Sequence, residues 1–238
     1  MKETLNKHKN IVLQFSGGKD SLATLFVCEP WWDKITVVWV NTGAAMQETK
    51  DVWEKVKKLV PHVFELITNQ PNQVAEMGYP VDVLPLLSHP IFNKDSVRVQ
   101  PFYDCCSANM WMPMQALMQH MKPTLIIRGQ KNVDKMKGPV RSGKVIDGVE
   151  YLHPIEDWTD ERVFEYLKMT PIGVPPHYEF MGTSLDCWSC TAYLQENKGK
   201  LTYLKKFEPG MYEEVRRRLI RVREALRLHD HTDEILKE

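Results

Sequence analysis

The 238-residue chain has no apolar run that approaches the roughly 18 residues of a membrane-spanning helix, so we expect no membrane partner. It also lacks net charge, since 31 lysines and arginines balance 31 aspartates and glutamates, and this balance does not indicate a strongly basic nucleic-acid-binding protein. Internal repeats and low-complexity tracts are absent, and a hydrophobic content of 43% argues against disorder. These absences together favour a cytoplasmic globular protein with one large core.

Cysteine is scarce as well, and its distribution is more informative than its number. Five cysteines are too few for a disulfide scaffold in a chain of this length. Four of them form two close pairs, Cys105 with Cys106 and Cys187 with Cys190, which in a reducing compartment are typical of metal or redox sites. Thiolates are soft ligands that select iron–sulfur clusters or zinc over hard ions. Cys28 stands alone in an apolar segment and is expected in the core.

Short apolar runs alternate with segments of helical spacing. The runs are rich in β-branched residues and end at polar or turn residues, as buried strands do. This alternation predicts βαβ units, and therefore an α/β fold with an open, mostly parallel sheet of about five strands and helices on both faces. The expected strands are 11–15, 35–40, 63–68 and 124–129, and the expected helices between them include 21–32 and 49–62.

The remaining segments set the domain organisation. Proline, asparagine and glutamine punctuate residues 70–100, which favours a long and partly irregular connection. Thr159 is a suitable N-cap for a helix over 157–168, because acidic residues follow it in the first turn. We expect one domain over residues 1–202 and a charged helical extension over 203–238 that packs on it.

The predicted extension carries six arginines within RRRLIRVREALR, residues 216–227. Such a run can contact nucleic acid. An apolar stripe at helical spacing is more typical of a helix that packs on its own domain or on a second copy of the chain. A nucleic acid and a second copy of the chain, in a homodimer, therefore both stay open as partners. The helix is expected to break near His229. The stripe consists of Val215, Leu219, Val222 and Leu226.

The stretch SGGKDS, residues 16–21, follows the first expected strand and opens a helix. A strand that ends in this way presents unpaired backbone N–H groups and the positive end of the helix to a ligand. The glycines allow close approach, Lys19 supplies a charge, and Ser16 and Ser21 supply hydroxyl groups, so phosphate is the expected ligand. The Walker A pattern GxxxxGK[ST] is absent. The alternative is a glycine-containing turn without a ligand.

The same stretch resembles the pyrophosphate-binding loop, or PP-loop, of the adenine nucleotide alpha hydrolase-like group. VNTGAAMQET (40–49), IIRGQKN (126–132) and HPIEDWTDERVFEYL (153–167) are similar, in this order, to segments of phosphoadenylyl-sulfate and adenylyl-sulfate reductases. The resemblance covers about residues 10 to 195 and implies an adenine nucleotide, ATP or a sulfonucleotide, as ligand. The nucleotide-binding residues that it implies are Ser16, Gly17, Gly18, Lys19, Asp20, Ser21, Asn41, Thr42, Gly43, Arg128 and Gly129.

The two cysteine pairs are similar to the CC…CxxC arrangement that carries a [4Fe-4S] cluster in adenylyl-sulfate reductases. This resemblance implies that Cys105, Cys106, Cys187 and Cys190 are the ligands of such a cluster. Zinc remains the alternative, although two adjacent cysteines suit one tetrahedral ion poorly. The double cysteine is expected to open a helix, whose N-terminal field would favour the thiolate form.

Three departures from the reductase pattern bear on the reaction. No cysteine follows Cys190, whereas sulfonucleotide reductases carry their nucleophilic cysteine in a C-terminal Glu-Cys-Gly-Leu-His motif. Asn-Met-Trp at 109–111 stands where the family has a basic pair and a valine. Gln130 and Lys131 replace at least one arginine at the end of the substrate-binding strand. The nucleotide pocket is therefore expected to be retained and the sulfate-reducing apparatus to be lost.

Three functions remain open. The first is an ATP pyrophosphatase or adenylating enzyme for sulfur transfer, in which the loop binds ATP with Mg²⁺, Lys19 neutralises developing charge and Asp20 holds the metal ion or the start of the helix. The second is a (phospho)adenylyl-sulfate reductase that uses a thiol supplied by a partner such as thioredoxin. The third is a non-catalytic sensor of nucleotide or redox state. The first two imply a sulfur-donor or thiol protein as partner.

Overall fold

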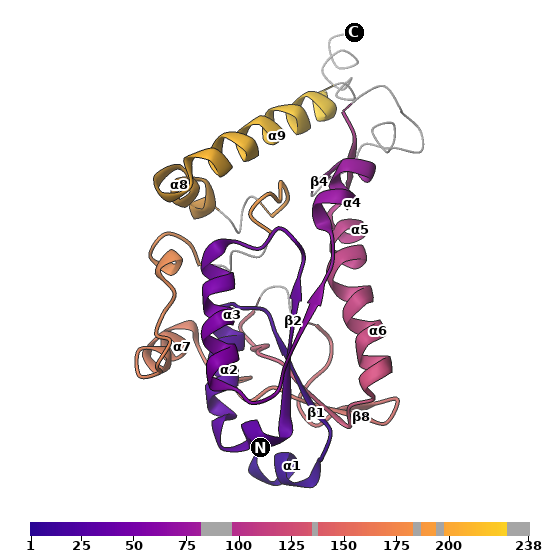
Figure 1. The fold of residues 1–238 in the computed structure, drawn as a ribbon, viewed down its shortest axis with the longest axis vertical. Coiled ribbons are helices and arrows are strands. Elements are labelled where there is room, and N and C mark those ends of the chain that lie inside the picture. Colours follow the sequence, from indigo (N-terminus) through magenta and orange to yellow (C-terminus); the bar gives the residue numbers. More distant parts are fainter. Residues whose placement is uncertain (82–96, 135–137, 183–186, 194–197, 228–238) are drawn as a thin grey trace.

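The computed structural model describes residues 1–81, 97–134, 138–182, 187–193 and 198–227. A six-stranded sheet with the strand order β3-β2-β1-β6-β8-β7 forms its centre (Figure 1). Neighbouring strands are parallel, except that β7 runs antiparallel to β8 at the edge. The predicted α/β fold is therefore confirmed. The strands are β1 (Ile11–Phe15), β2 (Ile35–Asn41), β3 (Val63–Ile67), β6 (Leu125–Ile127), β7 (Val145–Ile146) and β8 (Val149–Leu152).

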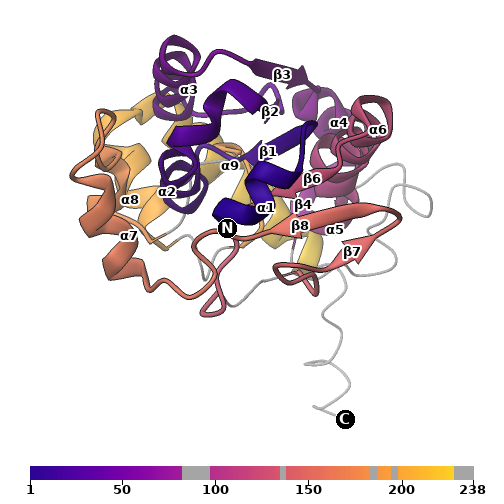
Figure 2. The same cartoon turned by 90° about the horizontal axis from the view of Figure 1, so that it is seen from below.

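Helices cover both faces of the sheet, as the alternating pattern predicts (Figure 2). The helix α2 (Lys19–Val27) and the helix α3 (Gln47–Leu59) lie on one face, and α6 (Met112–Met121) lies on the other. The predicted helix over 21–32 divides into α2 and the 3₁₀ helix η1 (Glu29–Lys34), because Pro30 has no N–H with which to continue an α-helix. A short helix, α1 (Lys2–Lys7), precedes β1.

The hydrophobic core lies between β1, β2 and the helices α2 and α3. Side chains such as Leu13, Val37 and Trp53 are 0–1% exposed there, and Cys28 is fully buried among them as predicted. The central strand β1 is buried on both faces, which explains why its sequence is a continuous apolar run and does not alternate. This packing holds β1 in place. The segment SGGKDS, which begins directly after β1, is thereby held at the carboxyl end of that strand.

A hairpin formed by β7 and β8 accounts for the difference between six strands and the predicted number of about five. Its turn consists of Asp147 and Gly148, both with positive φ (51° and 81°). An Asp-Gly pair between short apolar runs is a strong signal for a two-residue hairpin of this type, and here it lies between Val145–Ile146 and Val149–Leu152. The sequence therefore contained the signal for the extra strand.

The double cysteine does not open its helix, contrary to expectation. The helix α5 (Phe102–Cys106) begins three residues before Cys105, continues through the π-helical turn η3 (Ser107–Trp111) and runs into α6. Burial, and to a smaller extent the nearby Cys190, raises the pKa of the Cys105 thiol to about 11. The helix terminus therefore does not hold Cys105 as a thiolate in this structure.

The C-terminal helices pack across one end of the domain (Figure 1). They are α8 (Lys198–Phe207) and α9 (Pro209–Arg227), so the boundary predicted at residues 202/203 falls inside α8. Tyr203, Leu204 and Val215 form a small core with Met46 and Met181. The break expected near His229 lies outside the described residues.

Other predicted segments form with small changes. The helix α7 (Asp160–Leu167) has the predicted N-cap, since the Thr159 hydroxyl accepts the N–H of Arg162 at 3.3 Å. The connection over 70–100 contains α4 (Gln70–Met77) and the parallel pair β4 (Tyr79–Val81) and β5 (Val99–Pro101), and its middle lies outside the described residues. No helix in the described part of the chain is long and apolar enough to cross a membrane.

Replacement of Gly129 by alanine tests how closely β6 approaches α2. An added Cβ would lie 2.7 Å from the backbone carbonyl group of Asp20, so Gly129→Ala should lower the free energy of unfolding by about 1–3 kcal/mol. Urea unfolding measures this change. The control is Gly210→Ala at the start of α9, where an added Cβ meets nothing within 4 Å and little change is expected. Equal stability of both variants would contradict the close approach.

Candidate nucleotide and thiol site

The loop of residues 16–21 joins β1 to α2. Gly17 has a φ of +83°, and a Cβ there would lie 2.7 Å from Cγ2 of Thr49, so the position requires glycine. The Ser16 hydroxyl donates to the Ser21 hydroxyl at 3.1 Å, and Gly18 is the N-cap of α2. The loop is thus a tight turn that directs backbone N–H groups outward at the positive end of a helix.

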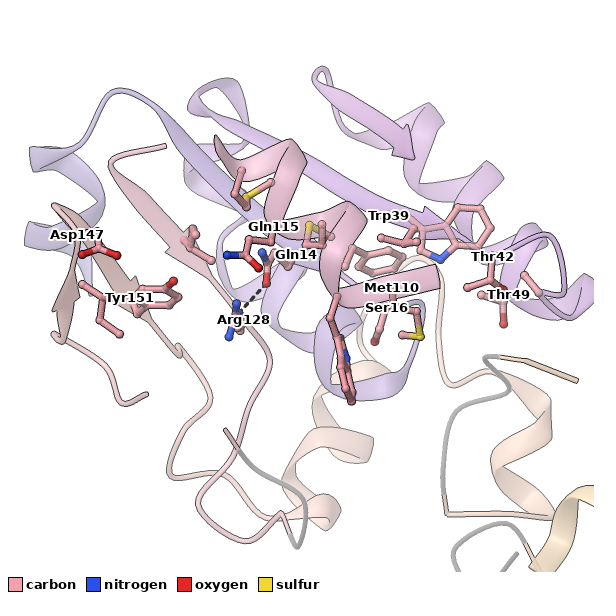
Figure 3. A pocket seen from close by; sticks show the side chains of 18 residues that line it. Gln14, Ser16, Trp39, Thr42, Thr49, Met110, Gln115, Arg128, Asp147 and Tyr151 are labelled. Carbon is pink, nitrogen blue, oxygen red and sulfur yellow. Dashed lines mark hydrogen bonds between the residues drawn. The ribbon is translucent and has the colours of Figure 1, made fainter. Parts of the chain in front are cut away.

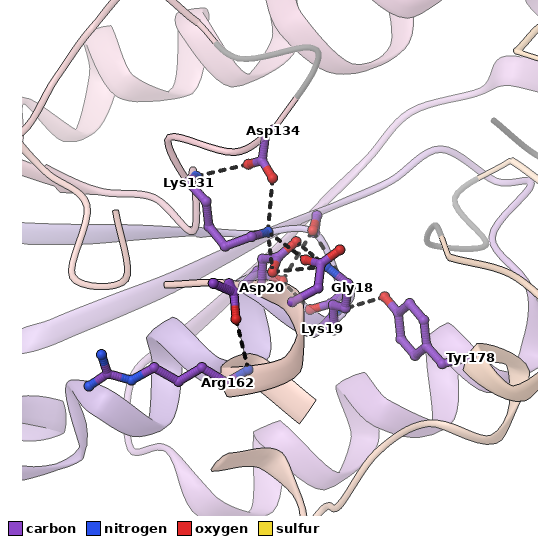
Figure 4. Close-up of polar contacts among 11 residues, drawn as sticks. Gly18, Lys19, Asp20, Lys131, Asp134, Arg162 and Tyr178 are labelled. Atoms are coloured by element: carbon purple, nitrogen blue, oxygen red, sulfur yellow. Dashed lines mark hydrogen bonds and ion pairs between the residues drawn. The ribbon is translucent and has the colours of Figure 1, made fainter. Parts of the chain in front are cut away.

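A tyrosine hydroxyl occupies the position where this turn would bind an anion. The backbone N–H of Lys19 donates to the hydroxyl of Tyr178 at 2.7 Å (Figure 4). Tyr178 belongs to the 3₁₀ helix η4 (Pro176–Glu179), far from the loop in sequence. A phosphate oxygen could accept the same N–H, so the bond marks an acceptor position at the start of α2.

Two lysines and three aspartates form an ion-pair network behind the loop (Figure 4). Lys19 Nζ lies 2.9 Å from Asp20 and 2.7 Å from Asp160. Lys131 Nζ is fully buried and lies 2.6 Å from Asp20, 2.8 Å from Asp134 and 3.2 Å from Asp160. Burial alone would lower the pKa of Lys131, but its bonds to Asp134 and Asp20 raise it above the ordinary value, so the group is charged.

A cavity of about 690 Å³ opens beside the loop, at the carboxyl ends of β1, β2 and β6 (Figure 3). Three of the predicted nucleotide-binding residues line it: Ser16, Thr42 and Arg128. The other eight are not among the residues that line it. The remaining lining residues are Gln14, Phe15, Trp39, Val40, Ala45, Thr49, Met110, Trp111, Met114, Gln115, Met118, Ile126, Ile146, Asp147 and Tyr151.

Arg128 supplies a positive charge on the cavity wall. Its Nε donates to Oε1 of Gln14 at 2.6 Å, and its guanidinium carbon lies 5.2 Å from the ring centroid of Tyr151 (Figure 3). Burial lowers the pKa of Arg128, yet an arginine pKa starts high enough for the group to stay charged at neutral pH. No carboxylate of the described residues forms an ion pair with it within 4 Å, which leaves its charge available to a ligand.

Two further predicted residues, Asn41 and Gly43, shape the end of β2. The amide of Asn41 donates to Glu65 on β3 at 2.8 Å, and its oxygen accepts the N–H of Gly43 at 3.1 Å. Gly43 has a φ of +79° and turns the chain toward Ala44. Both residues therefore position Thr42, which is 4% exposed and faces the cavity.

The segment of Cys187 to Cys190 packs against this same end of β2. Cys187 forms an isolated β-bridge with Ala45, and the N–H of Trp188 donates to the carbonyl of Ala44 at 3.1 Å. The Cys187 sulfur lies 3.5 Å from the Thr42 hydroxyl oxygen. Thr42 therefore contacts a thiol while it also lines the cavity.

The two cysteine pairs lie close to one another. Cys105 is near enough to Cys190 for the latter to raise the pKa of the Cys105 thiol. The hydroxyl of Tyr193 is hydrogen-bonded to Cys106 and is also near Cys190, and burial together with these thiols raises the pKa of Tyr193. None of the five cysteines, all of which lie in the described part of the chain, is in a disulfide. The fold thus brings both predicted pairs to one place.

Comparison with known proteins identifies the family. The model of the phosphoadenosine phosphosulfate reductase domain matches residues 10–193, which is most of the chain. The chain belongs to this family. The match ends three residues after Cys190 and so leaves α8 and α9 outside the family domain.

Individual relatives of this reductase-family chain are distant. An uncharacterised protein of Methanocaldococcus jannaschii is 21% identical over 194 residues, which are 79% of this chain and 43% of the relative, so the chain spans less than half of that protein. The phosphoadenylyl-sulfate reductase of Candida auris superposes with a TM-score of 0.53 at 13% identity, over 75% of this chain and 81% of the reductase. The NH₃-dependent NAD synthetase of Campylobacter jejuni superposes with a TM-score of 0.47 at 12% identity, over 92% and 87%.

In this family member the four thiols suit an iron–sulfur cluster by their chemistry, since all four are soft donors on two neighbouring segments. As the described side chains stand, however, no three histidine, cysteine, aspartate or glutamate groups are arranged to ligate one metal ion. The Cys105 sulfur instead lies near the amide groups of Gln70 and Asn109. The thiols are therefore neighbours whose side chains must turn toward one another to bind a shared group.

Several residues of the site were not predicted from the sequence. The methionines 110, 114 and 118 recur every four residues, so their shared helix face could have been anticipated but its exposure to a cavity could not. Lys131, Asp160 and Tyr178 come from three separate segments that only the fold brings to the PP-loop. Lys131 and Asp160 lie in the family-like segments 126–132 and 153–167, but those segments do not indicate that the two residues form ion pairs, and the context of Tyr178 carries no signal for its contact.

The buried His177 beside Tyr178 makes stability depend on pH. Burial lowers the pKa of His177 to about 4, and neither ring nitrogen has a hydrogen-bond partner among the described residues. Since the unfolded chain binds a proton near pH 6.5 and the folded chain does not, stability should fall by up to about 3 kcal/mol between pH 6.5 and pH 4. Urea unfolding across this range should show a flatter profile for His177→Phe.

The control for this prediction is His120→Phe, because His120 is exposed on α6. This variant should keep the pH profile of the natural chain. If the stability of His177→Phe falls as steeply between pH 6.5 and pH 4 as that of the control, the loss of stability at low pH does not come from His177.

Proposed function

We propose that this protein binds ATP in the cavity beside the PP-loop and uses it to activate an acceptor for sulfur transfer. The observation that carries the proposal is the position of Thr42, which lines the cavity and lies 3.5 Å from the Cys187 sulfur. A nucleotide in the cavity would therefore lie next to the thiols. Sulfur chemistry and nucleotide chemistry would share one end of the sheet.

The cavity supports a nucleotide by its size and by its lining. About 690 Å³ lies within the ordinary range of small-molecule sites. Methionine and aromatic side chains offer an apolar surface for a purine ring, and Arg128 offers a charge for a phosphate group. The phosphate chain would extend to the N–H groups at the start of α2, where it would displace the hydroxyl of Tyr178.

The ion-pair network gives the charged residues of the loop defined roles. Two lysines face three aspartates, Asp20, Asp134 and Asp160, so the network as a whole carries one net negative charge near the phosphates. A Mg²⁺ ion bound to ATP would take Asp20 as its protein ligand, which suits a hard cation. Lys19 would neutralise the leaving pyrophosphate if, besides its release from Asp20, it also turned away from Asp160, which lies 2.7 Å from its Nζ.

The proposed reaction has two balanced steps. An acceptor oxygen attacks the α-phosphorus of ATP, the bond from this phosphorus to the bridging oxygen breaks, and pyrophosphate leaves. The sulfur of a hydrosulfide ion then attacks the activated carbon or phosphorus of the acceptor, the bond from this atom to the acceptor oxygen breaks, and AMP leaves with that oxygen. The protein's groups hold the phosphates in line and stabilise the charge that develops on each leaving group.

A [4Fe-4S] cluster would be held by Cys105, Cys106, Cys187 and Cys190, and when bound it would supply a site that holds or delivers sulfur. The residues around the thiols would shield this site from water, since Cys105 is 5% exposed and Ser189 between the second pair is 3% exposed. Zinc at the same thiols remains the alternative.

Two other functions have an observation in their favour. The family match favours a (phospho)adenylyl-sulfate reductase that takes its nucleophilic thiol from a partner, since residues 191–238 contain no cysteine. The bond from Lys19 N–H to Tyr178 favours a non-catalytic sensor, because nucleotide binding would move η4 away from the loop. Both use the same cavity and differ in the product that they form.

Product analysis separates the three functions. Anaerobically purified protein should release pyrophosphate from ATP in the presence of an acceptor and sulfide. Release of sulfite from adenylyl sulfate or phosphoadenylyl sulfate with a reduced thioredoxin would support the reductase instead. Nucleotide binding with neither product would support the sensor and would overturn the proposed sulfur transfer.

Replacement of Arg128 tests the nucleotide position. Arg128→Met should weaken ATP binding by roughly tenfold or more, because a charge-assisted contact contributes about 1.5–3 kcal/mol. Isothermal titration calorimetry measures the affinity, and iron content should not change. The control Arg216→Met removes an exposed arginine of α9 and should bind ATP normally. Unchanged affinity in Arg128→Met would place the nucleotide elsewhere.

A further inference from the structure

A buried lysine on the C-terminal helix α8 contacts the second thiol pair. Lys200 on α8 is 7% exposed, and its Nζ donates to the carbonyl oxygens of Cys187 at 3.0 Å and of Cys190 at 3.1 Å. A buried ammonium is costly unless charge-assisted hydrogen bonds compensate for lost water. The position of this lysine is therefore tied to the turn that carries both cysteines.

The turn from Cys187 to Cys190 is closed by its own backbone and then held from outside. The N–H of Cys190 donates to the carbonyl of Cys187 at 3.0 Å, and the N–H of Ala192 donates to the Cys190 sulfur at 3.4 Å. Lys200 connects the carbonyls at the two ends of this turn. The ammonium thereby fixes the distance between the backbones of the two thiol residues.

The approach of α8 to this turn is itself constrained. An added Cβ at Gly199 would lie only 1.8 Å from the carbonyl oxygen of Phe180, so α8 begins in close contact with that segment. A second cation arrives from α9, where Arg218 donates to the carbonyl of Ser189 at 3.4 Å and lies 5.7 Å from the ring centroid of Trp188. Donor groups from both C-terminal helices thus adjoin one turn, although the charge of Arg218 is also paired with Glu214 on α9 at 2.6 Å.

We propose that Lys200 is a positioning residue that clamps the Cys187–Cys190 turn and places a positive charge beside the sulfur site. The C-terminal helices, which lie outside the matched family domain, are then part of the functional site. The clamp follows from the contacts of Lys200 alone, whereas its effect on a bound cluster rests on the proposed function. A cation next to a cluster favours the reduced state, because reduction adds negative charge.

The clamp is tested in metal-free protein by amide hydrogen exchange of the peptide that covers residues 187–193. Lys200→Met should increase its exchange rate by about tenfold, since the turn loses the ammonium that joins its ends. Lys200→Arg should restore slow exchange, because it keeps donors and charge. The matched control is Lys205→Met on the exposed face of the same helix, which should exchange like the natural chain.

The charge is tested by the reduction potential after anaerobic reconstitution with iron and sulfide. Lys200→Gln keeps a hydrogen-bond donor without the charge, so it should exchange slowly yet have a more negative potential than the natural chain. This variant also serves if Lys200→Met does not fold. If folded Lys200→Met shows the same amide exchange rate over residues 187–193 as the natural chain, the clamp is overturned. If Lys200→Gln has the same reduction potential as the natural chain, the role of the charge is overturned.

The two proposals can fail separately. If the natural chain takes up no iron and sulfide, the cluster assignment of the proposed function fails, and hydrogen exchange still decides whether Lys200 clamps the turn. If the natural chain takes up a cluster but all Lys200 variants match it in exchange and in potential, only the role of Lys200 fails.

Discussion

The buried ammonium group of Lys131 connects the elements on which the site depends. It forms ion pairs with Asp20 at the start of α2, with Asp160 at the start of α7 and with Asp134 after β6. A charge without water must keep such partners, so the three segments cannot separate without a large loss of stability. Gly129 allows the end of β6 to lie close to the start of α2, because the absence of a side chain leaves space for the backbone of Asp20. The PP-loop is thereby fixed at the carboxyl end of β1.

Parallel strands then determine where chemistry can take place. Because β1, β2 and β6 end at one edge, the loop after β1, Thr42 after β2 and Arg128 after β6 surround one cavity. The distant Cys187–Cys190 turn reaches this edge by pairing with Ala45. Sulfur and nucleotide are adjacent in the proposed function for this topological reason. The C-terminal helices complete the arrangement from outside the family domain, through Lys200 and Arg218.

The sequence predicts local structure well where one segment contains the whole signal. The apolar run over 11–15 becomes β1 without a change of boundary, and Thr159 caps α7 as expected. The turn at Asp147 and Gly148 carried an equally local signal, although the expected strands did not include its hairpin. Lys131 could not be assigned from sequence, because its burial depends on carboxylates from three separate segments. The same holds for Tyr178, which meets the PP-loop only through the packing of η4.

The most direct measurement of the central claim is the distance between the nucleotide and the sulfur site. Electron–nuclear double resonance on reduced, ATP-bound protein detects ³¹P nuclei that lie close to a paramagnetic cluster. Our account predicts a ³¹P coupling that disappears when ATP is omitted, because Thr42 borders both sites. Reduced protein that binds ATP but shows no ³¹P coupling would contradict a shared site.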